Sequence, residues 1–137
     1  MIRTAPLEQA ELSIIGAGCA GLSLARQLVR TEKTSSIKAC LYGPVSPAAT
    51  IRHSWGFWAT QELKEQTELA RQRWHKWQII TAERKITQTA VLHPYCRLDS
   101  RDWLTHCLNI IDGNIQKEPD NLPTAGAKPV FDSRPPN

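Results

Sequence analysis

Apolar residues near the start of the chain follow a strand–helix–strand pattern. The run Leu12–Ile15 is short, apolar and rich in isoleucine, which predicts a buried strand. Behind it, apolar residues recur at helical spacing until a polar stretch begins at Thr31; they are Leu22, Leu24, Ala25, Leu28 and Val29. A second apolar run, 37–42, ends at Gly43-Pro44 and predicts a second strand. Two strands joined through a helix should lie parallel in one sheet, so 12–43 is a predicted β-α-β unit.

The middle of the chain has weaker patterns. Residues 52–58 are dense in aromatic side chains and show no clear period. The charged stretch 61–73 is predicted to be helical. Its residues, Glu65 and Leu69 among them, lie at similar spacing to polar partners along the segment. Segments 78–81 and 86–92 are predicted to be two strands of a hairpin around a polar turn.

A second amphipathic helix is predicted after position 99. Ser100 is a favourable N-cap residue, and Gly113 can end the helix. Between them, one face is apolar and consists of Trp103, Leu104, Cys107, Leu108 and Ile111. The stretch 112–129 is polar and contains proline and glycine, so we expect a loop, and 130–132 is a short apolar segment.

Composition places the chain among ordinary globular domains. It has 137 residues, of which 41% are hydrophobic and 22% charged, which excludes wholesale disorder. The net charge of +4 is spread along the chain, so we expect no nucleic-acid partner. The four cysteines form no CxxC pair, which favours a reduced, cytoplasmic protein. The uncharged run 12–25 is shorter than the roughly 20 apolar residues that a membrane span needs.

A glycine motif lies between the first strand and the first helix. Its residues are Gly16, Ala17, Gly18, Cys19, Ala20 and Gly21, in the pattern GxGxxG. The first glycine permits a tight turn, the second lets the backbone approach a diphosphate, and the third lets the helix pack closely on the sheet. The motif therefore predicts dinucleotide binding at the helix N-terminus, where the macrodipole favours negative charge. The alternative is a glycine-rich turn that holds no ligand.

One expected part of a dinucleotide site is missing. An acidic residue at the end of the second strand, roughly 20 residues after the motif, normally accepts hydrogen bonds from the adenosine ribose. Tyr42 and Gly43 stand there, and no Asp or Glu occurs between Glu32 and Glu62. We therefore expect weak nucleotide binding, and an acidic residue introduced at position 43 should strengthen it.

Two further segments resemble a known family. The sequence His53-Ser54-Trp55-Gly56-Phe57-Trp58 resembles the HTWSF-like or RTWCFW-like signature of bacterial and plant lycopene cyclases. Trp74 and Trp77 follow, then 94–100 before the second helix, and then 130–135, which resembles the family's strand-end D-[AS]-R motif. The resemblance covers essentially the whole chain but about the first third of a typical family member, and the tract from 111 to 130 looks shortened.

The resemblance implies an α/β fold, namely a Rossmann-like FAD/NAD(P)-binding domain with a parallel sheet, incomplete, plus a small β insertion. The whole of 1–137 would be a truncated domain of this kind. It would comprise the β-α-β unit 12–43, the aromatic signature and insertion 52–98, and a helix with a terminal strand in 99–137.

The resemblance also implies a parent reaction. In lycopene cyclases an enzyme carboxylic acid protonates a terminal double bond of lycopene, the cation closes into a ring, and proton loss leaves a β-ring. Reduced FAD is required without net redox, with NAD(P)H as the electron source, and a peripheral position at the inner face of the membrane would suit the polyene. The catalytic residue stays unassigned in this chain, and the missing C-terminal portion would be a partner. The alternative function is a non-catalytic FAD/NAD(P)-binding remnant or interaction module.

The remaining candidate residues each have two interpretations. By resemblance, Trp55, Phe57 and Trp58 line the path to the flavin or the polyene; otherwise they pack in a core or a domain interface. Arg134 contacts a phosphate or the flavin edge, or else pairs with Asp132 at the surface. The histidines and cysteines lack the spacing of paired zinc ligands, so we expect no metal site.

Overall fold

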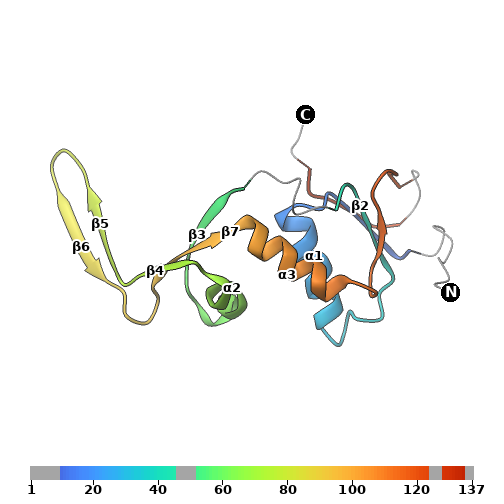
Figure 1. Ribbon diagram of the computed structural model, residues 1–137, viewed down its shortest axis with the longest axis horizontal. Coiled ribbons are helices and arrows are strands. Elements are labelled where there is room, and N and C mark those ends of the chain that lie inside the picture. The colour runs from blue at the N-terminus through green and yellow to red at the C-terminus, as the bar shows by residue number, and fades with distance from the viewer. Residues whose placement is uncertain (1–9, 46–51, 124–127, 135–137) are drawn as a thin grey trace. The chain divides into compact units, whose positions relative to one another are not determined.

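The computed structural model describes residues 10–45, 52–123 and 128–134 (Figure 1). They divide into two compact units. The first unit contains the described residues before position 50 and after position 103, and the second contains those in between. Within the described residues, no helix is long and apolar enough to span a bilayer.

The first unit is built on a parallel sheet of four strands. In sheet order these are β8 (Gln116–Glu118), β2 (Ala39–Tyr42), β1 (Leu12–Ile15) and β9 (Val130–Asp132). Every neighbouring pair is parallel, with Ile14 beside Leu41 on one side and beside Phe131 on the other. The predicted β-α-β unit is therefore confirmed, and the fold is α/β with the strand arrangement of a Rossmann-like domain.

Helices α1 (Cys19–Arg30) and α3 (Ser100–Ile111) supply the apolar cover of this sheet. The chain moves from β1 to β2 to β8 in one direction, and right-handed crossovers then place the connecting helices on the same face. The core that results is closed to solvent at Ile14, Leu22, Ala25, Leu41, Cys107 and Ile111. The apolar face predicted for α3 is thus confirmed in the part of the helix that belongs to this unit.

The start of α3 differs from the sequence prediction. The carboxylate Oδ1 of Asp99 accepts a hydrogen bond from the backbone N–H of Arg101 at 3.0 Å, so Asp99 performs the capping role. Ser100 is already helical, and its hydroxyl oxygen instead accepts a hydrogen bond from the backbone N–H of His53 at 2.9 Å. Ser100 therefore ties the start of the aromatic signature to the helix. Its prediction as the N-cap was wrong because this tertiary hydrogen bond takes its side chain.

The end of α3 follows the prediction, but the segment behind it does not. Gly113 adopts a φ of +75°, a conformation that glycine reaches without strain, and ends the helix. The predicted loop that follows contains strand β8, which pairs with β2 from Cys40 to Tyr42. Its sequence, Gln-Lys-Glu, has no apolar residue, so hydrophobic patterning could not reveal a strand that the backbone hydrogen bonds of β2 complete.

The second unit contains an antiparallel sheet in the order β3 (Ser54–Trp58), β7 (Tyr95–Asp99) and β4 (Gln72–Trp74). The helix predicted over 61–73 is shorter, a 3₁₀ turn η2 (Gln61–Leu63) followed by α2 (Lys64–Leu69). Its last residues form β4 instead, because Arg73 and Trp74 pair with Cys96 and Tyr95 of β7. Sheet pairing outweighs a helical pattern that had no continuous apolar face to bury.

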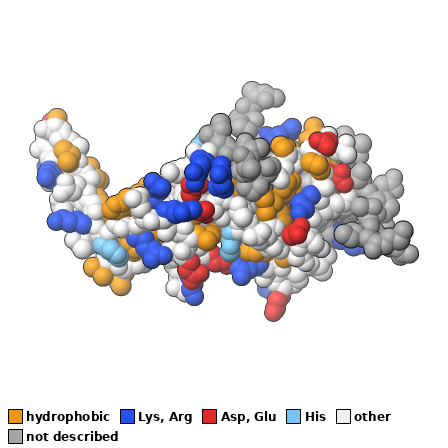
Figure 2. All heavy atoms as spheres, in the orientation of Figure 1, with side chains coloured by type: hydrophobic (Ala, Val, Ile, Leu, Met, Phe, Trp, Pro, Cys, Tyr) orange, Lys and Arg blue, Asp and Glu red, His pale blue; other side chains and the backbone are white. Residues whose placement is uncertain are grey.

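The predicted hairpin is confirmed as β5 (Lys76–Ile80) and β6 (Lys85–Thr89), which pair antiparallel (Figure 1). Most of its side chains are exposed, including Ile79, Ile80 and Ile86. Figure 2 shows hydrophobic and basic side chains together on this ribbon. Trp77 is the partly covered residue of the hairpin, and its ring packs edge-on against Trp58 with 5.5 Å between centroids.

Replacing Asp99 tests the revised cap of α3. The Asp99→Ala variant loses both the cap and the ion pair from Arg52 Nη2 to Oδ2 at 3.2 Å, so we expect a loss of about 1–2 kcal/mol in the free energy of unfolding. Asp99→Asn keeps an oxygen for the cap and removes the charge, so it should cost less. Chemical denaturation of the three proteins measures both values. Equal losses in the two variants would show that the ion pair, and not the cap, is what matters.

Candidate functional site

The glycine motif forms the turn between β1 and α1. Gly16 has a φ of +98°, which favours glycine, and its N–H donates a hydrogen bond to the carbonyl of Tyr42 at 2.8 Å. Gly18 then stands at the N-cap of α1. The loop therefore lies at the carboxyl ends of β1 and β2, which is where ligands bind in open α/β sheets.

The other two glycines of the motif have opposite surroundings. A Cβ atom at Gly21 would overlap the carbonyl oxygen of Gly16, so α1 packs directly on the loop. A Cβ atom at Gly18 would meet nothing within 4 Å, and its φ of −83° is open to any residue. Gly21 is therefore required by packing, whereas the space in front of Gly18 is available to a ligand.

The electrostatics at this helix end favour an anion. The first N–H groups of a helix have no partner within the helix, and Gly18 offers no side chain to cap them. The first turn of α1 contains no acidic residue, so nothing opposes the positive end of the macrodipole. These features together fit the diphosphate of a dinucleotide.

Cys19 lies within this first turn but is not activated. Its thiol is accessible at the surface, yet partial desolvation by neighbouring atoms raises its pKa above the ordinary value, and the hydrogen bond with Ser23 lowers it less. A raised pKa leaves little thiolate near neutral pH. We therefore assign Cys19 to the wall of the loop and not to nucleophilic chemistry.

Ser133 closes the loop from the far end of the chain, a role that the sequence analysis missed. Its hydroxyl donates to the carbonyl oxygen of Ile15 at 2.9 Å and lies 3.2 Å from that of Gly16. Its backbone N–H also donates to Ile15, at 2.9 Å. The available signal was its place inside the D-S-R segment, directly after the short apolar strand β9.

Arg134, the neighbouring candidate, forms an ion pair with Asp132. Its Nη2 lies 2.6 Å from Oδ2 and its Nε 2.9 Å from Oδ1, and the backbone N–H of Arg134 also donates to Oδ1. The structure thus shows the surface pairing that the sequence analysis left open. A cofactor contact for Arg134 stays a prediction, and the guanidinium would have to share or leave this carboxylate to make it.

The end of β2 explains why position 43 is glycine. Gly43 has a φ of +118°, and a Cβ atom there would lie 3.7 Å from the N–H nitrogen of Ala17. An acidic residue at position 43 would therefore be strained, so the backbone disfavours an acid there, and its effect on nucleotide binding stays a prediction. The N–H of Gly43 donates to the carbonyl of Glu118 at 3.0 Å, so an acidic residue on β8 lies beside the end of β2.

The aromatic signature forms β3, and its residues point to two sides. Strand alternation places Trp55 and Phe57 on one face and Trp58 on the other, so the structure does not bring all three together. Trp58 packs edge-on against Tyr95, at 5.0 Å, and against Trp77. Gly56 is needed because a Cβ atom there would overlap the Tyr95 hydroxyl. Trp58 therefore has a packing role within the second unit, and substrate contact of the three residues stays a prediction.

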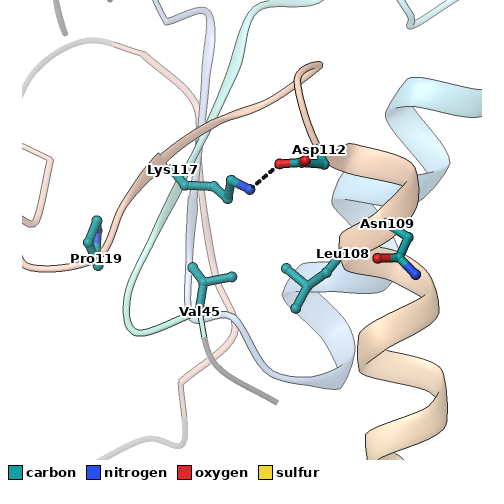
Figure 3. Close-up of a pocket in the computed structure, with 6 residues that line it drawn as sticks. All are labelled: Val45, Leu108, Asn109, Asp112, Lys117 and Pro119. Atoms are coloured by element: carbon teal, nitrogen blue, oxygen red, sulfur yellow. Dashed lines mark hydrogen bonds and ion pairs between the residues drawn. The ribbon is translucent and has the colours of Figure 1, made fainter. Parts of the chain in front are cut away.

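A cavity of about 350 Å³ lies beside α3 and β8 (Figure 3). Its lining is Val45, Leu108, Asn109, Asp112, Lys117 and Pro119. Lys117 and Asp112 point toward each other across it at 2.7 Å, and this hydrogen-bonded pairing lowers the pKa of Asp112. The two charged side chains of this lining therefore satisfy each other.

The thiols and imidazoles of the described segments do not gather into a metal site. Within residues 10–45, 52–123 and 128–134, no group of three His, Cys, Asp or Glu side chains lies close enough to hold an ion. Burial raises the pKa of Cys107 to about 12, and burial also raises the pKa values of Cys40 and Cys96. These thiols stay protonated near neutral pH and act as small apolar packing groups.

The Asp132–Arg134 pair gives a testable titration. The hydrogen bonds from Arg134 lower the pKa of Asp132 to about 2, so the pair is complete above the ordinary carboxyl range and is lost as pH falls toward 2. NMR titration of the Asp132 carboxyl should give a midpoint near that value. In Arg134→Gln, which keeps the side-chain length but not the charge, the midpoint should rise toward the ordinary aspartate value. An unchanged midpoint would show that Arg134 does not hold this carboxylate in solution.

Comparisons with known proteins agree with this architecture. The chain is similar to P. aeruginosa PqsL, solved in complex with 2-aminobenzoylacetate, with a TM-score of 0.60 and 15% identity. That match covers 80% of this chain and 33% of PqsL, and it supports the fold alone. A candidate FAD containing monooxygenase from Photorhabdus luminescens subsp. laumondii TTO1 matches with a TM-score of 0.43 and 22% identity, covering 77% of this chain and 30% of that protein. The chain thus spans about a third of the length of both proteins.

The family assignment comes from the sequence itself. A comparison with curated proteins gives no match. The family model for lycopene cyclase protein matches residues 11–111, which is well over half of the chain and includes β1, the glycine motif, the aromatic signature and α3. The chain belongs to the lycopene cyclase protein family.

Proposed function

We propose that this chain is the nucleotide-binding portion of a lycopene cyclase-type flavoprotein and that its cofactor is FAD. The observation that supports this most directly is the open space in front of Gly18, at the uncapped N-terminus of α1. No atom lies within 4 Å of a Cβ placed at Gly18, which leaves room for a diphosphate. At Gly16 and Gly21, by contrast, a Cβ would overlap Ser133 and the Gly16 carbonyl, respectively. Family membership then favours FAD over other dinucleotides.

The chain's own groups would bind the cofactor chiefly through the backbone. The N–H groups of the loop and of the first turn of α1 would donate hydrogen bonds to the diphosphate oxygens. Gly21 keeps the helix end close to the loop, and the hydrogen bonds of Ser133 fix the carbonyls of Ile15 and Gly16 so that the loop is preorganised. A preorganised loop loses little conformational freedom on binding, which favours affinity.

The reaction proposed for the complete flavoprotein is the acid-catalysed cyclisation of the ψ-ends of lycopene to β-rings. In that reaction reduced FAD, with NAD(P)H as electron source, would supply electrostatic support for positive charge without net redox. The residues of this chain would hold and orient the cofactor, and the aromatic faces of β3 would offer flat apolar surface to a polyene. Because lycopene is a long hydrocarbon that dissolves in the bilayer, we also propose that the protein is cytoplasmic and attaches peripherally to the inner face of the membrane.

The carboxyl groups that have a shifted pKa in the described segments do not resemble a general acid. An acid that protonates an alkene benefits from a raised pKa in a dry pocket. The shifted carboxyls here move the other way. Hydrogen bonds from Arg71 lower the pKa of Asp102, those from Lys117 lower that of Asp112, and a hydrogen bond with Thr60 lowers that of Glu62. This observation favours the second candidate function, a binding module that does not itself catalyse cyclisation.

The Gly18→Thr variant tests the cofactor site. Threonine is a favourable N-cap residue and meets no atom within 4 Å at its Cβ, so the fold should persist, whereas its side chain fills the diphosphate position. We expect FAD and ADP to bind about tenfold more weakly or worse, equivalent to about 1.4 kcal/mol, in fluorescence or calorimetric titration. Gly18→Ala, which adds only a Cβ atom, is the graded control and should lose less. Undiminished binding by Gly18→Thr would contradict the assignment of this loop.

The catalytic proposal has a cellular test. Residues 1–137, expressed in lycopene-accumulating bacteria, should give no γ-carotene or β-carotene above the empty-vector background, because the shifted carboxyls described above are held ionised. Chromatography of the extracted pigments measures this, and a complete family member is the positive control. Ring-bearing product from the chain alone would contradict the binding-module interpretation.

A further inference from the structure

Strand β2 ends without the acidic residue that usually binds the ribose, but Glu118 lies beside that end on the neighbouring strand β8. It is the last residue of β8 and lies in register with Tyr42, the last residue of β2. Its carbonyl accepts the hydrogen bond from the N–H of Gly43 at 3.0 Å. Adjacent strands lie about 4.8 Å apart, a distance that the two methylene groups of a glutamate can bridge. A carboxylate on β8 can therefore reach the region that a shorter acid on β2 would serve.

The Glu118 carboxylate is held in place by neighbours that keep it available. Gln116 Nε2 donates to Oε1 at 2.8 Å, and Asn121 Nδ2 lies 3.3 Å from Oε2. A carboxylate has about four acceptor positions, so two neutral amide donors leave room for two more. Lys117, the adjacent cation, is directed to Asp112 instead (Figure 3). The charge of Glu118 is thus oriented without being neutralised by its neighbour on β8.

The alternatives at this edge are excluded by the backbone and by burial. Position 43 has a φ of +118°, which disfavours a side chain, and Tyr42 is closed to solvent. Tyr42 and Glu118 are register partners on neighbouring parallel strands, so their side chains leave the same face of the sheet. Burial raises the pKa of Tyr42, and the nearby charge of Glu118 adds to that rise. Alternation along β8 agrees, because Lys117 between Gln116 and Glu118 points to the cavity beside α3.

We propose that Glu118 accepts the hydrogen bonds of the adenosine ribose hydroxyl groups, in place of the acid that usually ends the second strand. This inference rests on the proposed nucleotide site. It also sets a specificity, because an ionised carboxylate repels a phosphate group on the ribose. The site should therefore prefer FAD, ADP or NAD-type nucleotides to ribose-phosphorylated ones.

The test compares ADP with dideoxy-ADP, which lacks both ribose hydroxyl groups, by calorimetric titration of the 137-residue chain. Glu118→Gln keeps the shape of the side chain and removes its charge. It should weaken ADP binding by about ten- to a hundredfold, the range expected for charge-assisted hydrogen bonds, and leave dideoxy-ADP binding unchanged. Glu118→Asp, which keeps the charge on a shorter arm, should fall in between. Asp120→Asn, at an exposed acid two positions along the chain, is the matched control and should bind both ligands as the parent does.

The outcomes separate this inference from the proposed function. If the parent chain binds neither ADP nor FAD, the nucleotide site and the role of Glu118 both fall. If the parent binds ADP and Glu118→Gln binds it equally well, only the role of Glu118 falls. A Glu118→Gln variant that loses the same factor for ADP and for dideoxy-ADP would show general disturbance of the fold, and this too overturns a ribose contact.

Discussion

The carbonyl groups of Ile15 and Gly16 are the point on which the candidate site depends. Ser133 donates to them from the end of the described chain, and α1 packs onto the Gly16 carbonyl through Gly21. The end of β1, the start of α1 and the segment after β9 therefore meet at two consecutive peptide groups. Because β9 pairs with β1 through the same contact region, the edge strand and the glycine loop support each other.

The two units of the chain are stabilised in different ways. In the first unit, side chains such as Ile14, Leu22, Leu41 and Ile111 are closed to solvent, and each contributes roughly 1.5–3 kcal/mol through burial. In the second unit, the hairpin β5–β6 exposes most of its residues, and a two-stranded hairpin alone is marginally stable in water. The contact of Trp77 with Trp58 is what anchors this ribbon to the three-stranded sheet. Local opening should therefore begin in the hairpin and spare the glycine loop between β1 and α1.

The sequence predicts the parts of the fold where hydrophobic patterning and backbone chemistry agree. The β-α-β unit, the hairpin and the apolar face of α3 follow from periodicity, and the turn at Gly16 follows from its place after a strand. β8 could not be predicted, because Gln116, Lys117 and Glu118 form a strand through hydrogen bonds to β2 and not through burial. Ser100 was misassigned for a related reason, since a tertiary partner, His53, takes its side chain.

The sequence predicts the glycine motif of the candidate site but not the residues that reach it through tertiary pairing. The glycines carry their roles in the local sequence, so the motif alone identifies the loop. Ser133 and Glu118 come beside β1 and β2 only through the sheet, and no local pattern marks them. Parallel sheets, whose neighbouring strands are far apart in sequence, hide such residues more often than hairpins do.

The bond from Ser133 to Ile15 joins residues 118 positions apart, which has a consequence for biosynthesis. A ribosome that has released β1, α1 and β2 has delivered the glycine motif but not the strand that locks it. Contacts of such long sequence separation slow folding, because the loop between them loses entropy before the contact forms. During synthesis at roughly 5–20 residues per second, the emerging motif would wait for several seconds in an unlocked form. Within that interval the free edge of β1 is open to pairing with other chains or to capture by chaperones.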